Sequence, residues 1–153
     1  MQRTANAIWH GSITRGQGEI TTSSEILKSV PYSFSTRFGQ SPGTNPEELI
    51  AAAHASCFAM ACSAALSAKK FEPDFLDVVS NVTLDKQGDS WTVTASHLTL
   101  HARVPNIDDA QFQTIVKDAK ENCPISKLLK AEITLDAKLD EATTKPWAPP
   151  PPQ

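Results

Sequence analysis

The sequence predicts an α+β fold, because stretches with strand character lie on both sides of one central helix. The first forty residues alternate short β-prone segments with glycine-containing turns. Residues 45–69 combine a helix start signal with an alanine-rich apolar run. Residues 78–104 and 133–139 alternate apolar and polar side chains with the period of a strand. Segregation of strands and helices in this way is typical of the α+β class.

Three short strands are expected before the central helix, at residues 7–10, 18–23 and 32–38. The sequence RGQG at 15–18 is typical of a hairpin turn between the first two. The third expected strand contains the sequence STRF, which includes Arg37.

The central helix is expected to begin at Pro46 and to run to about Lys69. Asn45 is a favourable N-cap, and Glu47 in the first turn complements the helix dipole. Residues 49–68 carry no formal charge and are long enough to span a bilayer. Most of them are alanine and serine, however, and that hydrophobicity is too weak for a membrane span. We therefore expect a helix buried on most sides of a globular domain.

A second β region is expected to begin with a hairpin whose strands, 78–86 and 91–104, flank the loop sequence QGDS. In the second strand the apolar side chains change from odd to even positions. This change of parity predicts a bulge or a strong bend near residues 96–97.

Two helices and one strand are expected to complete the fold. Residues 108–121 have apolar side chains on one helical face. Cys123 and Pro124 begin a short helix that runs to about Lys130, and residues 133–139 form the last strand.

The chain is expected to consist of one globular domain, residues 1–140, and a proline-rich tail, residues 141–153. A length of 153 residues with 40% hydrophobic side chains is sufficient for one buried core. The tail, EATTKPWAPPPPQ, can form neither helix nor sheet ladder and is expected to be extended or disordered.

Charge and cysteine content restrict the partners and the compartment. A net charge of -3 gives no electrostatic reason to expect nucleic acid or an anionic membrane as a partner. Three cysteines without a disulfide framework favour a reducing compartment. The N-terminal residues also lack the apolar run of a secretory signal, so we expect a cytoplasmic protein.

Two cysteines occupy contrasting positions. Cys57 lies within the apolar central helix, whereas Cys123 directly precedes a helix that starts with proline, at the positive end of its dipole. Such a pair is suited to a reactive cysteine and a second cysteine that resolves its oxidised form. Cys62 lies about 140° around the helix from Cys57, cannot bridge to it and is expected only to pack.

Three segments resemble one known family. PYSFSTRF at 31–38, GTNPEELIAAAHASCF at 43–58 and NCPISKLLKAEITLDAKL at 122–139 are similar to the osmotically inducible protein C (OsmC) family, within the OsmC/Ohr superfamily of thiol-dependent organic hydroperoxide reductases. The resemblance runs from about Ala7 to Leu139. It implies an OsmC-like fold, with two antiparallel β regions around a long buried central helix, and an intertwined homodimer with active sites at its interface.

The resemblance also implies the chemistry. Cys57 would reduce organic hydroperoxides to alcohols and become a sulfenic acid, and Cys123 would condense with it to a disulfide. A dihydrolipoyl-type protein, or alternatively thioredoxin, would reduce that disulfide. We expect no metal, haem or flavin cofactor. The implied physiological role is defence against oxidative or osmotic stress.

Cys57 needs a cation, because apolar neighbours raise the pKa of a thiol. By resemblance this cation is Arg37, held by Glu47. Arg15, in the RGQG turn, is the rival cation, and Glu48 is a weaker candidate than Glu47 for the carboxylate.

Helix geometry constrains this site further. Glu47 and Cys57 are ten residues apart in one predicted helix, which corresponds to a rise of about 15 Å. They cannot meet within a regular helix. Either the helix is broken between them, or the activating residues of a given site come partly from another subunit.

Other functions compete with the peroxidase. His54, one turn before Cys57, could act as the base of a cysteine hydrolase or acyltransferase. Zinc binding by His54 with Cys57, Cys62 and Cys123 lacks the usual ligand spacing. A non-catalytic protein that binds an apolar ligand is the remaining alternative.

Overall fold

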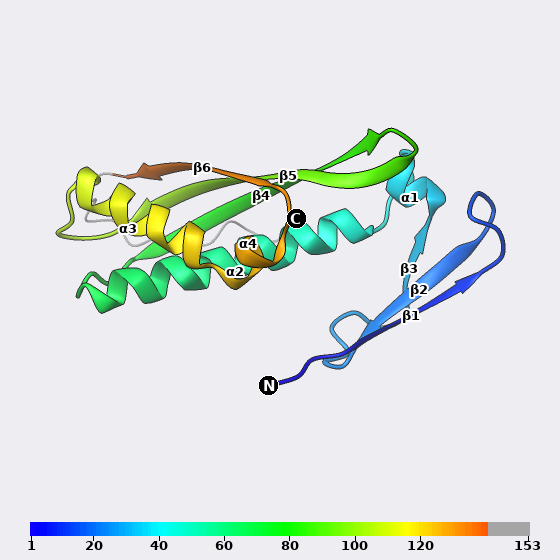
Figure 1. Cartoon of the computed structure of the whole chain (residues 1–153). Coiled ribbons are helices and arrows are strands. Elements are labelled where there is room, and N and C mark those ends of the chain that lie inside the picture. The colour runs from blue at the N-terminus through cyan, green and yellow to red at the C-terminus, as the bar shows by residue number, and fades with distance from the viewer. Residues whose placement is uncertain (141–153) are drawn as a thin grey trace. The chain divides into compact units, whose positions relative to one another are not determined.

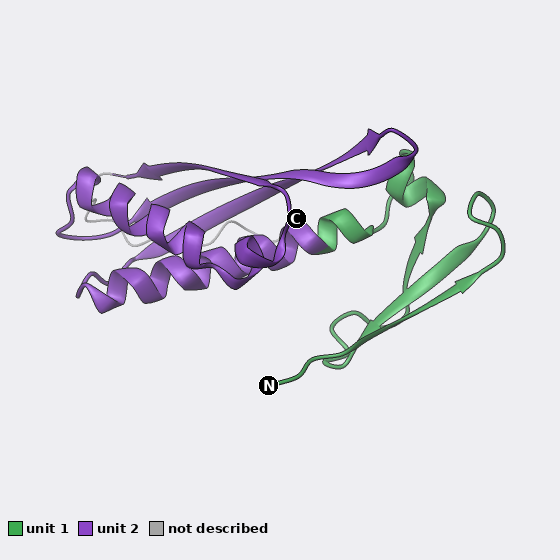
Figure 2. Ribbon diagram, viewed as in Figure 1, with its two compact units in different colours: residues 1–49 green, residues 50–153 purple. Residues whose placement is uncertain are grey.

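The computed structural model describes residues 1–140 and divides into two compact units, residues 1–49 and the chain from Ile50 onward (Figure 2). The expected tail, residues 141–153, lies outside the described residues, and its extended or disordered character stays a prediction.

The first unit contains a three-stranded antiparallel sheet. Strands β1 (Ala5–His10), β2 (Gln17–Thr22) and β3 (Val30–Ser33) follow one another in the order β1-β2-β3. The first two confirm the predicted strands to within about two residues. The turn between them occupies residues 11–16, so the predicted RGQG turn extends partly into β2.

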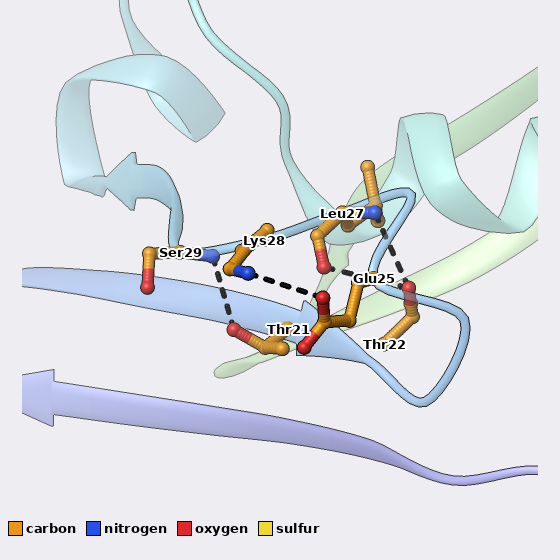
Figure 3. Close-up of polar contacts among 6 residues, drawn as sticks. All are labelled: Thr21, Thr22, Glu25, Leu27, Lys28 and Ser29. Atoms are coloured by element: carbon orange, nitrogen blue, oxygen red, sulfur yellow. Dashed lines mark hydrogen bonds and ion pairs between the residues drawn. The ribbon is translucent and has the colours of Figure 1, made fainter.

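A hydrogen-bonded loop connects β2 to β3 (Figure 3). The Thr22 N–H donates to the Leu27 carbonyl at 2.9 Å, and the Leu27 N–H donates to the Thr22 hydroxyl at 3.2 Å. The Ser29 N–H donates to the Thr21 hydroxyl at 3.0 Å. Threonine side chains thus hold the loop while Ser29 adopts a φ of 49°.

The predicted strand at 32–38 is wrong over most of its length, because α1 (Phe34–Phe38) is a helix. Ser33 and Thr36 form a capping box. The Thr36 N–H donates to Ser33 Oγ at 3.2 Å, and the Ser33 N–H donates to Thr36 Oγ1 at 2.9 Å. Two backbone donors at the helix start are thereby satisfied. Arg37 therefore lies in the last turn of a helix and not in a strand.

The central helix α2 (Pro46–Ala68) begins and ends as predicted. The Glu48 N–H donates to Asn45 Oδ1 at 2.9 Å, which confirms the N-cap. By length and composition alone, α2 is the one helix within residues 1–140 that could cross a membrane. Its residues beyond Leu49 belong to the second unit.

Burial of α2 on most sides is wrong for the single chain. Its fully buried side chains form one stripe, at successive intervals of four residues: His54, Phe58, Cys62 and Leu66. On the rest of the helix most side chains are small alanines and serines, and Met60 is 75% exposed. The helix therefore packs by one face, as expected from a 3.6-residue period.

The second unit contains a long antiparallel hairpin, β4 (Phe75–Gln87) and β5 (Ser90–Arg103). A two-residue turn at Gly88 and Asp89 joins them, and Gly88 has a φ of 61°, which favours glycine. The predicted bulge is present two residues before the expected place. Thr83 pairs with Ala95 and Leu84 with Val93, which leaves Thr94 as the extra residue.

The last strand, β6 (Glu132–Leu139), pairs with β5 in parallel, so the expectation of two wholly antiparallel β regions is wrong. Helices α3 (Asp109–Asn122) and α4 (Pro124–Leu128) carry the chain back along the sheet before β6 begins, which sets the parallel direction. The second sheet is therefore mixed, with the order β4-β5-β6.

The core of the second unit lies between this sheet and its helices. Figure 1 shows α2, α3 and α4 on one face of the β4-β5-β6 sheet. After the bulge, the even positions of β5 point inward, among them Leu98 and Leu100. They pack with Phe58 of α2 and with Phe112 and Val116 of α3, all fully buried. This packing fixes the face of α2 that carries its cysteines.

Candidate active site

The second unit brings Cys57 and Cys123 together although they come from α2 and from the junction of α3 and α4. Cys57 is half-buried and Cys123 is fully buried, and both thiols are free. Cys123 is at once the C-cap of α3 and the N-cap of α4, because Pro124 starts a new helix immediately. The predicted proximity of these two cysteines is thus present within a single chain.

The surroundings of Cys57 favour its neutral thiol. Burial raises the pKa of Cys57, the Ile125 backbone N–H acts in the opposite direction, and the neighbouring Cys123 raises the pKa further. The pKa of Cys57 is therefore above its usual value. An attacking thiolate at this position requires additional positive charge.

The surroundings of Cys123 have the opposite effect. Burial alone would raise the pKa of Cys123, but the nearby Ser126 N–H, Cys57 thiol, Ser126 hydroxyl and Ile125 N–H favour its thiolate and together lower that pKa. The N–H groups in the first turn of α4 have no partner within the helix and are available to a thiolate. Cys123 is thus the thiol that ionises more easily in this pair.

Cys62 is fully buried in the core, as predicted. Burial, followed by the charge on Cys123, raises the pKa of Cys62 to about 12. Such a thiol stays protonated near neutral pH and acts as a small apolar side chain.

Arg37 and Glu47 form a bidentate ion pair within the first unit. Arg37 Nη2 lies 2.6 Å from Glu47 Oε1, and Arg37 Nε lies 3.0 Å from Glu47 Oε2. The Glu47 side chain is only 14% exposed. Glu48, by contrast, is exposed, and Arg15 is exposed like Arg37 itself. The structure pairs the two residues favoured by the sequence analysis, and planar bidentate geometry holds the guanidinium in a fixed orientation.

Aromatic side chains surround this arginine. A cavity of about 240 Å³ in the first unit is lined by Arg37 and mainly apolar residues, namely Trp9, Ile13, Tyr32, Ser33, Phe34, Phe38 and Pro46. The guanidinium carbon of Arg37 lies 5.1 Å from the centre of the Phe38 ring. A fixed cation beside an apolar cavity can bind a molecule that has one polar and one apolar end.

His54 does not pair with Cys57 in the second unit. Its Nδ1 lies 2.7 Å from Ser96 Oγ and its Nε2 lies 2.8 Å from Ser126 Oγ, so both ring nitrogens are occupied by hydroxyl groups. This arrangement does not fit the base of a Cys-His hydrolase, in which the ring nitrogen must reach the nucleophile. Residues 1–140 contain no group of three or more His, Cys, Asp or Glu side chains placed to hold a metal ion. Sequence analysis missed the roles of Ser96 and Ser126 as partners of this histidine.

An α+β chain that places two free thiols side by side, one of them activated by backbone N–H groups, has the site of a dithiol redox protein. The pattern of the OsmC-like protein family matches residues 39–138. The chain is 45% identical over 139 residues to "Peroxiredoxin OsmC" of Escherichia coli (strain K12), across 91% of this chain and 97% of that protein. It is 29% identical over 133 residues to "Organic hydroperoxide resistance protein" of Xanthomonas axonopodis pv. citri, across 85% and 92% of the two chains. The chain belongs to the OsmC-like protein family.

Solved structures of this group share the fold. An OsmC-like protein of unknown function from Vibrio cholerae matches with a TM-score of 0.73 and 15% identity, over 90% of this chain and 99% of that one. The organic hydroperoxide resistance protein OhrB of Bacillus subtilis matches with a TM-score of 0.63 and 24% identity, over 90% and 98%. These likenesses agree with the two sheets and four helices described above.

Proposed function

We propose that this protein is a thiol-dependent peroxidase that reduces organic hydroperoxides to alcohols and so defends the cell against them. The observation that carries the proposal is the meeting of Cys57 and Cys123 in one site. The names of the relatives, a peroxiredoxin and an organic hydroperoxide resistance protein, support the same activity.

In the first step, the Cys57 thiolate attacks the distal peroxide oxygen. The new S–O bond forms as the O–O bond breaks, and the departing alkoxide takes up a proton to give the alcohol. Because burial raises the pKa of Cys57, this step needs a cation. We assign that role to Arg37, and Glu47 orients the guanidinium through the bidentate pair.

In the second step, Cys123 attacks the sulfur of the Cys57 sulfenic acid. A disulfide forms and hydroxide leaves, which becomes water with the proton given up by Cys123. A second dithiol then reduces the Cys57-Cys123 disulfide by thiol exchange. A dihydrolipoyl-type protein is the proposed reductant and thioredoxin the alternative, both in the cytoplasm.

The proposed assembly is an intertwined homodimer whose sites combine residues of both subunits. Helix α2 contains Glu47 and Cys57 without an internal glycine or proline, so about 15 Å of helix rise separates them. Arg37 is tied to Glu47 and not free to move alone. The apolar face of α2 that the single chain leaves exposed, including Met60, offers a surface for the second subunit.

We expect organic hydroperoxides to be better substrates than hydrogen peroxide. The Arg37 cavity has room for an alkyl or aryl group, and burial of apolar surface contributes about 25 cal/mol per Å². Catalytic efficiency toward cumene hydroperoxide should exceed that toward hydrogen peroxide by at least about tenfold, as burial of some 60 Å² would give. Phe34→Ala should reduce this preference, and Ile26→Ala, an exposed apolar residue outside the cavity, is the matched control.

Peroxide consumption with a dithiol reductant tests the function directly. Steady-state turnover should be seen with dihydrolipoamide, which stands for the proposed reductant. Higher catalytic efficiency with reduced thioredoxin would favour the alternative reductant. Hydrolysis of thioesters with no consumption of peroxide would instead favour the cysteine hydrolase. Higher efficiency toward hydrogen peroxide than toward cumene hydroperoxide would contradict the substrate assignment.

A further inference from the structure

His54 is a fully buried titratable side chain that the mechanism above does not use. Its Nδ1 is bonded to Ser96 Oγ of β5 and its Nε2 to Ser126 Oγ of α4. Ser96 Oγ lies in turn 3.1 Å from Ser80 Oγ of β4. A continuous chain of polar groups therefore crosses the core from the sheet, through α2, to α4.

This chain ends at the thiol pair. Ser126 lies in the first turn of α4, three residues after Cys123, and its hydroxyl is among the groups that favour the ionised form of that thiol. Ser126 therefore lies near Cys123 while it is hydrogen-bonded to His54. His54 itself reaches Cys123 only through this serine.

The direction of each hydrogen bond follows from the number of hydrogens available. A hydroxyl has one hydrogen, so a Ser126 that donates to the Cys123 thiolate must accept its second bond from His54 Nε2–H. Burial lowers the pKa of His54, so the ring is neutral near neutral pH and carries only that one hydrogen. Nδ1 then accepts from the Ser96 hydroxyl, which accepts from Ser80. Every donor in the chain points toward Cys123.

We propose that His54 is a positioning residue for Cys123: through its Nε2–H it holds the Ser126 hydroxyl as a donor to the Cys123 sulfur and so favours the thiolate. The role of that thiolate in turnover rests on the proposed function, but the effect of His54 on Cys123 does not.

The consequence for the reaction lies in the second step. Cys123 must lose its proton before its sulfur attacks the Cys57 sulfenic acid, and that proton balances the departing hydroxide as water. When Cys123 is protonated, the direction of these hydrogen bonds can reverse. Cys123 S–H then donates to the Ser126 hydroxyl, and that hydroxyl donates to His54 Nε2, which in this tautomer carries no hydrogen and acts as the acceptor. The tautomer of His54 is thus linked to the ionisation of Cys123 without any charge on the ring.

A merely structural histidine would leave the ionisation of Cys123 unchanged, and this difference can be measured. The titratable group that affects Cys123 is Cys57 on α2. Cys62, also on α2, is affected by the charge on Cys123, and β4 and β5 contribute the hydroxyls of Ser80 and Ser96. A Cys57→Ser, Cys62→Ala background removes both other thiols. The ultraviolet absorbance of the thiolate then reports Cys123 alone as pH is varied.

In that background Ser126→Ala should raise the pKa of Cys123 by about 1 to 2, as loss of a hydrogen bond to a charged group predicts. His54→Asn should shift it in the same direction. His54→Gln should restore a value near that of the background, because the longer amide places an N–H donor near the position of Nε2. Ser67→Ala, at the far end of α2, is the matched control and should have no effect.

The second readout is the rate of disulfide formation after one equivalent of cumene hydroperoxide, with Cys57 and Cys62 intact. Ser126→Ala and His54→Asn should slow it several-fold, since a smaller thiolate fraction is partly offset by greater nucleophilicity. Sulfenic acid formation should not be slowed, because a less ionised Cys123 raises the pKa of Cys57 less. An unchanged Cys123 pKa in Ser126→Ala, or equal effects of Asn and Gln at position 54, would overturn the inference. If the wild-type protein consumes no peroxide, the proposed function fails, yet the titration still decides the role of His54. Should His54→Asn not fold, His54→Leu, which has a similar size and no donor, takes its place in the titration, and an unchanged Cys123 pKa in that variant would overturn the inference.

Discussion

Replacement of Cys57 with serine should abolish peroxide consumption even in a single turnover, a loss of at least about a thousandfold in rate, because a hydroxyl at this position has no accessible anionic form. Cys123→Ser should still consume one equivalent of hydroperoxide and then stop. Without its resolving partner, Cys57 should accumulate as sulfenic acid and become overoxidised with excess peroxide. Mass spectrometry after stoichiometric and excess peroxide measures each of these species.

The roles of the two cysteines could also be exchanged, with Cys123 attacking the peroxide and Cys57 resolving the product. The same experiment decides between the two assignments. Cys123 has the lowered pKa and Cys57 the raised one, so attack by Cys123 is the competing outcome. It would appear as one equivalent consumed by Cys57→Ser and none by Cys123→Ser. Cys62→Ala is the matched control, because that buried thiol stays protonated and should lose stability and not activity.

The sequence predicts a strand, helix or turn correctly where neighbouring residues alone determine it. The Asn45 cap, the hairpin at the QGDS sequence and the apolar face of α3 are all local, and the structure confirms them. The helix α1 was missed although Ser33 and Thr36 form a capping box, because aromatic residues around them also favour a strand. The parallel direction of β6 depends on where the intervening helices pack, which period-two alternation does not encode.

The candidate site was partly predictable for a similar reason. The resemblance supplied Cys57 and Cys123, and the structure places them together. The structure shows that Arg37 pairs with Glu47 and not with the exposed Glu48, whereas the action of this pair on Cys57 stays a prediction. Ser96 and Ser126 could not have been chosen from among the serines of the chain. Only the position of Ser96 in the inward row of β5, opposite the buried His54, gives it a role.

Two inactive variants should together restore activity if the site is shared between subunits. In that arrangement a Cys57→Ser subunit still supplies its Arg37-Glu47 pair to a partner that carries Arg37→Ala and an intact Cys57. One of the two sites in such a mixed dimer is complete, so co-refolding should give up to about half of wild-type activity per dimer, as two-fold symmetry requires. Each variant alone should be inactive. Differently tagged subunits allow the mixed dimer to be purified before the assay.

The reciprocal mixed dimer separates a shared site from one built within a single chain. In this dimer a wild-type chain pairs with the double variant Arg37→Ala, Cys57→Ser. If the sites are shared, both are incomplete, because the wild-type Cys57 meets alanine at position 37 of the variant and the wild-type Arg37 meets serine at position 57. Such a dimer should be inactive, whereas a site within one chain would retain half of the activity. A helix rise of about 15 Å separates Glu47 from Cys57, and α2 has no internal glycine or proline that could kink the helix and shorten this distance. This separation favours the shared site. Half activity in the reciprocal dimer, with none in the first pair, would mean that Arg37 reaches Cys57 of its own chain, and that the two subunits act independently.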